Sequence, residues 1–185
     1  MAGSITLNKA SGGQLTIAPE DGTSTETVSL NRDGFAQSGD LIQEKSSTFI
    51  YPSDMYTTSS TRVEISSDLR VTFTPKYSDS TIVLEYSANS MGTNASGITL
   101  NIAVVDVNTG SAVLTTGWDT LGRIHQSIAN GFNEHATTIK GKANNWGTTS
   151  KTLSVYYFQT GTGTIWANYL GGGGCGIFTI KEYKA

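Results

Sequence analysis

The chain has 185 residues and a formal net charge of -3, and only 15% of its residues are charged. About a quarter is usual, so uncharged Ser, Thr, Asn and Gly must supply much of the polar surface. The sequence contains no run of Lys or Arg, and such a run is the footprint of proteins that bind nucleic acid or anionic membranes. No apolar stretch approaches the roughly 20 residues of a membrane span. We therefore expect neither nucleic acid nor a membrane as a partner.

The first residues, Met1 to Asn8, have no basic start followed by an apolar segment, so no secretory signal is expected. Cys175 is the single cysteine, which rules out a disulfide within the chain. We expect synthesis in a reducing cytoplasm, with stability supplied by packing and assembly.

The N-terminal segment carries short apolar pairs separated by the turn-forming clusters 11–13 and 20–22. Ribbons this thin cannot bury enough surface to fold alone. Residues 1–40 are therefore predicted to form an extended β arm, which another chain or the main domain completes. The apolar pairs, Ile5 and Leu7, Leu15 and Ile17, and Val28 and Leu30, are the predicted anchor residues.

From residue 45 onward the dominant pattern is strict alternation of apolar and polar residues, which is typical of strands with one buried face. Turn clusters rich in Gly and Asn separate these runs at the spacing of an all-β domain. Residues 45–185 are therefore predicted to form an antiparallel, jelly-roll-like β-sandwich. The expected inward positions are Leu69, Val71 and Phe73, then Ile98, Leu100, Ile102 and Val104, then Leu153, Val155 and Tyr157, and the expected turns are 91–94, 108–110 and 161–163.

Residues 110–148 are harder to interpret. Leu121, Ile124, Ile128 and Phe132 lie near helical spacing, which allows a short helix. Ile124 and Ile128 also fit alternation, and Gly122 and Gly131 disfavour a long helix. The strand is the favoured interpretation and the helix remains open.

A search for catalytic and metal sites finds no nucleophile elbow. His125 and His135 could meet on neighbouring strands, but no Cys or acidic cluster stands at metal-ligand spacing. The Gly171–Gly174 run lacks the Lys-Ser/Thr that ends a phosphate-binding loop, so a wide turn or a close chain approach is favoured. Cys175 beside it is expected to be a small buried residue.

Carboxylates are scattered along the chain, and nothing favours a glycosidase pair among them. We therefore predict no catalytic residues, no metal site, no cofactor and no enzymatic activity. The carboxylates considered are Asp54, Glu64, Asp68, Asp79, Glu85, Asp106, Asp119 and Glu134.

The tryptophans are Trp118, Trp146 and Trp166, and the first two lie in turn-like contexts. An exposed Trp beside polar groups is a common sugar-stacking or interface anchor. Trp118 and Trp146 are therefore candidates for glycan or interface contact, and the favoured alternative is that they cover the ends of the core.

The stretch 68–86 reads as an alternating strand ending in Thr-Pro, a short polar turn and an Ile/Val/Leu strand, and 177–183 is a closing aromatic and β-branched strand. This pattern resembles appendage proteins of tailed bacteriophages, notably of marine and cyanobacterial phages. The segments Ser4–Leu7 and Leu15–Thr23 are similar to arms of phage fibre and decoration proteins. The resemblance covers about residues 60–90 and 150–185.

The resemblance implies a β-sandwich, often trimeric, that serves attachment or reinforcement on a virion. The first hypothesis is a capsid decoration (cement) protein or head appendage, a homo-oligomer bound to the major capsid protein or other virion proteins. The alternative is a receptor-binding tail fibre tip or spike that binds a host surface glycan. A small carbohydrate-active enzyme is the third hypothesis, which only the scattered acids favour.

Overall fold

The computed structural model describes residues 5–8, 14–17, 38–94, 97–114, 120–125, 133–143, 146–168 and 174–185. Its contacts divide the chain into two compact units, Met1–Phe35 and Ala36–Ala185.

The first unit contains two short antiparallel strands, β1 (Ile5–Asn8) and β2 (Gln14–Ile17). Their register pairs Ile5 with Ile17 and Leu7 with Leu15. The first two predicted apolar pairs therefore lie on strands that pair with each other, while completion of the arm by another chain or by the main domain stays a prediction. The third pair, Val28 and Leu30, lies outside the described residues.

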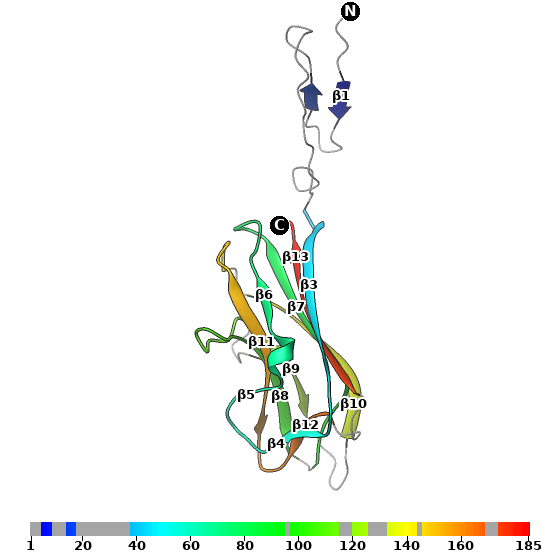
Figure 1. Ribbon diagram of the computed structural model, residues 1–185, viewed down its shortest axis with the longest axis vertical. Coiled ribbons are helices and arrows are strands. Elements are labelled where there is room, and N and C mark those ends of the chain that lie inside the picture. Colours follow the sequence, from blue (N-terminus) through cyan, green and yellow to red (C-terminus); the bar gives the residue numbers. More distant parts are fainter. Residues whose placement is uncertain are drawn as a thin grey trace, which may run out of the picture. The chain divides into compact units, whose positions relative to one another are not determined.

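The second unit contains two antiparallel sheets that face each other (Figure 1). In the six-stranded sheet the long strand β7 is central. Strands β13 and β12 pair with one of its edges and β10 with the other, while β3 lies beyond β13 and β4 beyond β12. The strands are β3 (Leu41–Ile50), β4 (Met55–Thr57), β7 (Thr81–Thr93), β10 (Asn133–Lys142), β12 (Ile165–Asn168) and β13 (Cys175–Tyr183).

The five-stranded sheet is built around β11, which pairs with β8 along one edge and with β5 and β6 along the other. Strand β9 pairs with the far edge of β8. The strands are β5 (Val63–Glu64), β6 (Val71–Phe73), β8 (Thr99–Asp106), β9 (Gly122–His125) and β11 (Lys151–Thr160).

The core lies between the two sheets and follows the alternation of the sequence. In β8 the inward residues Leu100, Ile102 and Val104 are fully buried. The facing strands β7 and β13 contribute Leu84, Tyr86, Phe178 and Ile180, all also 0% exposed. The predicted antiparallel β-sandwich is therefore confirmed, and burial of such side chains stabilises it by about 1.5–3 kcal/mol each before entropy costs.

Two local expectations are corrected. Leu69 belongs to the 3-10 turn η2 (Ser67–Leu69), which precedes β6. Residues 91–93, expected in a turn, continue β7. Met91 and Thr93 are fully buried, and Gly92 and Thr93 pair with both β10 and β12. Ile124 lies in strand β9, which agrees with the favoured interpretation, whereas Ile128 and Phe132 lie outside the described residues.

Two buried tyrosines explain why residue 176 in β13 is a glycine. The hydroxyls of Tyr51 and Tyr86 are hydrogen-bonded to each other and both rings are buried. Burial raises the pKa of Tyr51 to about 12. A Cβ on Gly176 of β13 would stand 2.7 Å from the Tyr51 hydroxyl and 2.9 Å from that of Tyr86. Position 176 therefore has no room for a side chain.

Side chains of β3 also join the two sheets along one side of the sandwich. Gln43 Nε2 donates to the carbonyl of Thr74 at 2.8 Å, and Lys45 Nζ donates to that of Thr72 at 3.0 Å. Ser47 Oγ donates to the carbonyl of Leu69, also at 3.0 Å. These bonds satisfy backbone carbonyls of η2, of β6 and of the residue that follows β6, and they connect this edge of the five-stranded sheet to β3.

Candidate functional site

An extensive polar cluster among the described residues surrounds Glu182, near the end of β13. Both its carboxylate oxygens accept from the backbone amide of Lys76, at 2.9 and 3.0 Å, and Oε1 also accepts from the amide of Tyr77 at 3.1 Å. The hydroxyl of Ser80 and the amide nitrogen of Gln43 donate to the same carboxylate. Glu182 therefore holds the turn between β6 and β7 against the closing strand.

The electrostatics of this cluster favour the charged carboxylate. Burial is the strongest influence and alone would raise the pKa of Glu182. The hydrogen bonds from Ser80, Lys76, Gln43 and Tyr77 together outweigh burial and hold that pKa below its ordinary value of 4.5. The side chain is 0% exposed, so this carboxylate is structural and not available to a substrate.

Sequence reasoning missed Glu182, although a signal was present. Phe178, Ile180 and Glu182 share the inward parity of β13, and a carboxylate at an inward position must be paired or hydrogen-bonded.

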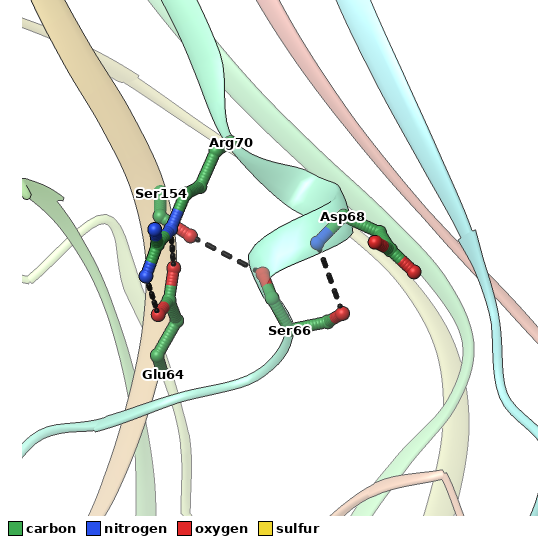
Figure 2. Close-up of polar contacts among 5 residues, drawn as sticks. All are labelled: Glu64, Ser66, Asp68, Arg70 and Ser154. Atoms are coloured by element: carbon green, nitrogen blue, oxygen red, sulfur yellow. Dashed lines mark hydrogen bonds and ion pairs between the residues drawn. The ribbon is translucent and has the colours of Figure 1, made fainter.

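A second carboxylate, Glu64 of β5, makes a two-pronged ion pair with Arg70, which follows η2 (Figure 2). The Arg70 Nε to Glu64 Oε1 distance is 2.8 Å, and the Nη2 to Oε2 distance is 2.7 Å. The hydrogen bonds from Arg70 lower the pKa of Glu64. Beside this pair, Ser66 Oγ accepts from the amide of Asp68 and begins the 3-10 turn, while the Ser154 hydroxyl donates to the Ser66 carbonyl at 3.4 Å. The pair thus braces the 3-10 turn between β5 and β6, two strands that run in the same direction along β11.

Three further carboxylates among the described residues each lie beside lysines. Asp106 lies 3.4 Å from Lys151, Glu85 pairs with Lys140 and Lys181, and Asp79 lies near Lys184. Asp119 lies outside the described residues. The described part of the chain contains no group of three or more His, Cys, Asp or Glu able to hold a metal ion.

The two histidines stand on strands of different sheets, His125 on β9 and His135 on β10. His125 Nδ1 is hydrogen-bonded to Thr99 Oγ1 at 2.8 Å.

Trp146 is partly buried and packs against the core. Its ring meets that of Phe73 edge to face, with centroids 6.4 Å apart, and Lys151 Nζ lies 6.0 Å from its centroid. Its indole nitrogen is buried without a hydrogen-bond partner in the described structure. Trp166 is 5% exposed, and Trp118 lies outside the described residues. This packing accords with the core-covering alternative for Trp146.

The outward face of the five-stranded sheet bears a hollow of about 240 Å³. It is lined by Thr99 and Asn101 of β8, Arg123 of β9, and Phe158 and Thr160 of β11. The strand register places Phe158, Asn101 and Arg123 in one row and Thr160, Thr99 and His125 in the next. The hollow thus combines one aromatic ring with hydroxyl, amide and guanidinium groups.

The outward face of the six-stranded sheet bears a shallower hollow beside the register shift in β10 between residues 135 and 137. Small and hydroxyl-bearing side chains line it, including Ser87 and Thr138, whose hydroxyls are 2.9 Å apart. Ile177 at its margin is 38% exposed. Cys175, expected to be buried, is partly exposed and also lines this hollow, because it has outward parity in β13.

No helix in the described residues is long and apolar enough to cross a membrane. No protein-family model matches the sequence, and no curated protein is similar to it.

Among solved structures, the fold is similar to that of the infectious bursal disease virus VP2 subviral particle, with a TM-score of 0.41 and 10% identity over 94% of this chain. The structure of the Gx strain of the same virus gives a TM-score of 0.39 and 11% identity over 93% of this chain. The T13 particle of that virus gives a TM-score of 0.34 and 11% identity over 97% of this chain. The chain spans less than half the length of these proteins, 47%, 43% and 43%.

Proposed function

We propose that this chain is a structural virion protein of a tailed bacteriophage, made in the host cytoplasm and carried on the particle as a capsid decoration protein or head appendage. Residues 1–40 anchor it, and residues 45–185 form the projecting body. The function is non-enzymatic and needs no cofactor.

The Glu182 cluster is the observation that carries the proposal. The resemblance to phage appendage proteins depends on two stretches, 68–86 and 177–183, that lie far apart in the sequence. In the fold they adjoin: β13 pairs with β7 along its length, and Glu182 closes the polar turn that follows Thr-Pro. The resembling residues therefore form one interdependent unit, which supports a shared architecture over a chance similarity of strand composition.

The surface supports the same role. Outward positions of both sheets include many hydroxyl and amide side chains, and the carboxylates of Glu64, Glu85 and Asp106 are each paired with a cation. Such a surface is suited to a protein exposed on a particle, where solubility depends on polar groups more than on charge.

We further propose that the protein is a homotrimer, as the resemblance implies. Closed cyclic symmetry is the usual arrangement of homo-oligomers. Ile50, which is 69% exposed, and Ile177 lie at diagonal positions on the outward face of β3 and β13. Association would bury apolar surface of this kind.

The experiment for this proposal is rebinding to purified particles that lack the protein, followed by sedimentation. The full chain should sediment with the particles, whereas a chain beginning at residue 36 should stay β-rich and soluble but remain in the supernatant. Replacing Ile5 and Leu7 by Ser should weaken binding, and the matched control Thr6→Ser should not.

Each failure has its own meaning. Normal binding by the shortened chain would contradict the arm as anchor, since the docking surface would then lie on the sandwich. Absence of binding by the full chain would contradict the particle role.

A further inference from the structure

The hollow between β8, β9 and β11 is lined by the side-chain amide of Asn101, whose oxygen makes no hydrogen bond among the described residues. Asn101 is only 2% exposed, although it lies on the outward face of its strand. Its Nδ2 donates to the carbonyls of Thr99 and Phe158 at 3.3 and 3.4 Å, and to Thr160 Oγ1 at 3.1 Å. Since two of these partners are carbonyls, the nitrogen must face them, and the orientation of the amide is fixed.

This orientation leaves Asn101 Oδ1 without a hydrogen-bond donor among the described residues. The oxygen is not one of the fully buried polar atoms that lack a partner, so it remains accessible from the hollow and can accept a hydrogen bond there. Because Asn101 lines the hollow, a hydroxyl donor placed there would satisfy the oxygen.

The remaining lining groups define the class of molecule that supplies such a hydroxyl. Phe158 offers a partly exposed aromatic ring, Thr99 and Thr160 offer hydroxyls, and Arg123 offers guanidinium donors. A pyranose ring has an apolar C–H face that stacks on an aromatic ring and a rim of hydroxyls that both donate and accept. A few placed polar groups around an aromatic wall are typical of small-molecule sites.

The volume of the hollow and the charge of its lining residues restrict the class of ligand further. The hollow of about 240 Å³ is smaller than the roughly 300–1,000 Å³ of sites that enclose drug-sized ligands, so it suits a single ring. No carboxylate lines it, whereas Arg123 does. Guanidinium groups pair well with carboxylates, and Arg123 lines the hollow with a side chain that carries five N–H donors.

We infer that this hollow binds one pyranose unit of a polysaccharide, with Phe158 stacking on the sugar, Asn101 accepting from a hydroxyl, and Arg123 favouring a ring that bears a carboxylate. The hollow on the six-stranded sheet lacks both an aromatic ring and a charged group among its lining residues, so it does not offer this combination. The inference does not depend on attachment to a particle.

The test is ligand-observed NMR on the full chain with methyl pyranosides of glucose, galactose and mannose and with their uronic acid counterparts. At least one uronic pyranoside should bind with a millimolar Kd and more tightly than its neutral counterpart. Phe158→Leu should weaken binding of both about tenfold. Arg123→Gln should remove only the preference for the acid.

Tyr156→Leu is the matched control, because Tyr156 has the same outward parity two residues earlier in β11 but does not line the hollow. It should leave binding unchanged, and circular dichroism should show that all three variants remain folded. The inference is overturned if no pyranoside binds, if Phe158→Leu binds like the parent chain, or if Tyr156→Leu weakens binding equally.

Discussion

The backbone amide of Lys76 donates to both carboxylate oxygens of Glu182, at 2.9 and 3.0 Å, although 106 residues separate the two. This contact joins the turn after β6 to the last strand of the sandwich. The buried carboxylate of Glu182 therefore fixes the turn between β6 and β7 against β13, a strand far away in the sequence.

Replacing this carboxylate should therefore destabilise the body. Glu182→Gln would turn an amide NH₂ toward the donors of Lys76, Tyr77 and Gln43, and we expect a loss of about 1.5–3 kcal/mol in the free energy of unfolding. Urea denaturation measures this loss. The control is Glu44→Gln, on the exposed face of β3, which should stay within about 0.5 kcal/mol of the parent chain. An equal effect of both changes would contradict the structural role of Glu182.

The carboxylate of Glu182 should also make the free energy of unfolding depend on pH. The pKa of Glu182 in the folded chain lies below its ordinary value of 4.5, so its contribution is complete above that value and is lost as the pH falls through the folded pKa. The free energy of unfolding should therefore decrease as the pH is lowered below 4.5. Glu64 and Glu85, whose pKa values are also lowered, contribute to the same decrease.

The variant Glu182→Gln separates the contribution of Glu182 to this pH dependence from the contributions of Glu64 and Glu85. Its stability should fall less steeply below pH 4.5 than that of the parent chain, because one titrating carboxylate is gone. Glu44→Gln should keep the full slope. Identical slopes for the parent and Glu182→Gln would show that Glu182 is not held charged by its neighbours.

The contact of Gly176 with the tyrosine pair predicts a double-mutant effect. Gly176→Ala should destabilise the chain by about 1–3 kcal/mol, since overpacking a buried site forces its neighbours to shift. Removing the Tyr51 hydroxyl relieves the shortest contact of the methyl group, at 2.7 Å, while that with the Tyr86 hydroxyl at 2.9 Å remains. Gly176→Ala with Tyr51→Phe should therefore be less destabilised than the two single losses added together. Strict additivity in thermal or urea unfolding would contradict this packing.

The proposed trimer predicts the mass of the protein in solution. Light scattering at micromolar concentration should give three times the chain mass of 19.6 kDa. Ile177→Asp places a charge on the exposed apolar positions of β13 and should lower that mass, whereas Glu44→Gln should not. A monomer mass for the parent chain would contradict the trimer.

Alternation in the sequence was sufficient to predict the sandwich. Leu100, Ile102 and Val104 of β8 and Leu153, Val155 and Tyr157 of β11 are buried as expected, because a period of two assigns residues to faces without knowledge of partners. Turn signals were less reliable. Gly110 and Gly161 adopt positive φ in the expected turns, but Gly92 lies inside β7, since a glycine in a long strand looks the same in sequence as one in a turn.

Polar contacts between distant strands could not be predicted in this way. Glu182 and Lys76 meet only because β13 pairs with β7, and strand order is not encoded in local periodicity. The hollow between β8, β9 and β11 likewise depends on the cross-strand register of Phe158, Asn101 and Arg123. Trp146 stood out in the sequence as an aromatic beside polar residues, whereas Phe158 looked like any member of an alternating strand.

The most direct test of the virion role is the copy number of the protein in purified phage particles, measured by quantitative mass spectrometry against the major capsid protein. A decoration protein or head appendage predicts that the chain copurifies with particles in many copies. A handful of copies per particle would contradict decoration of the head and favour the tail fibre alternative. Absence from purified particles would contradict the structural role altogether.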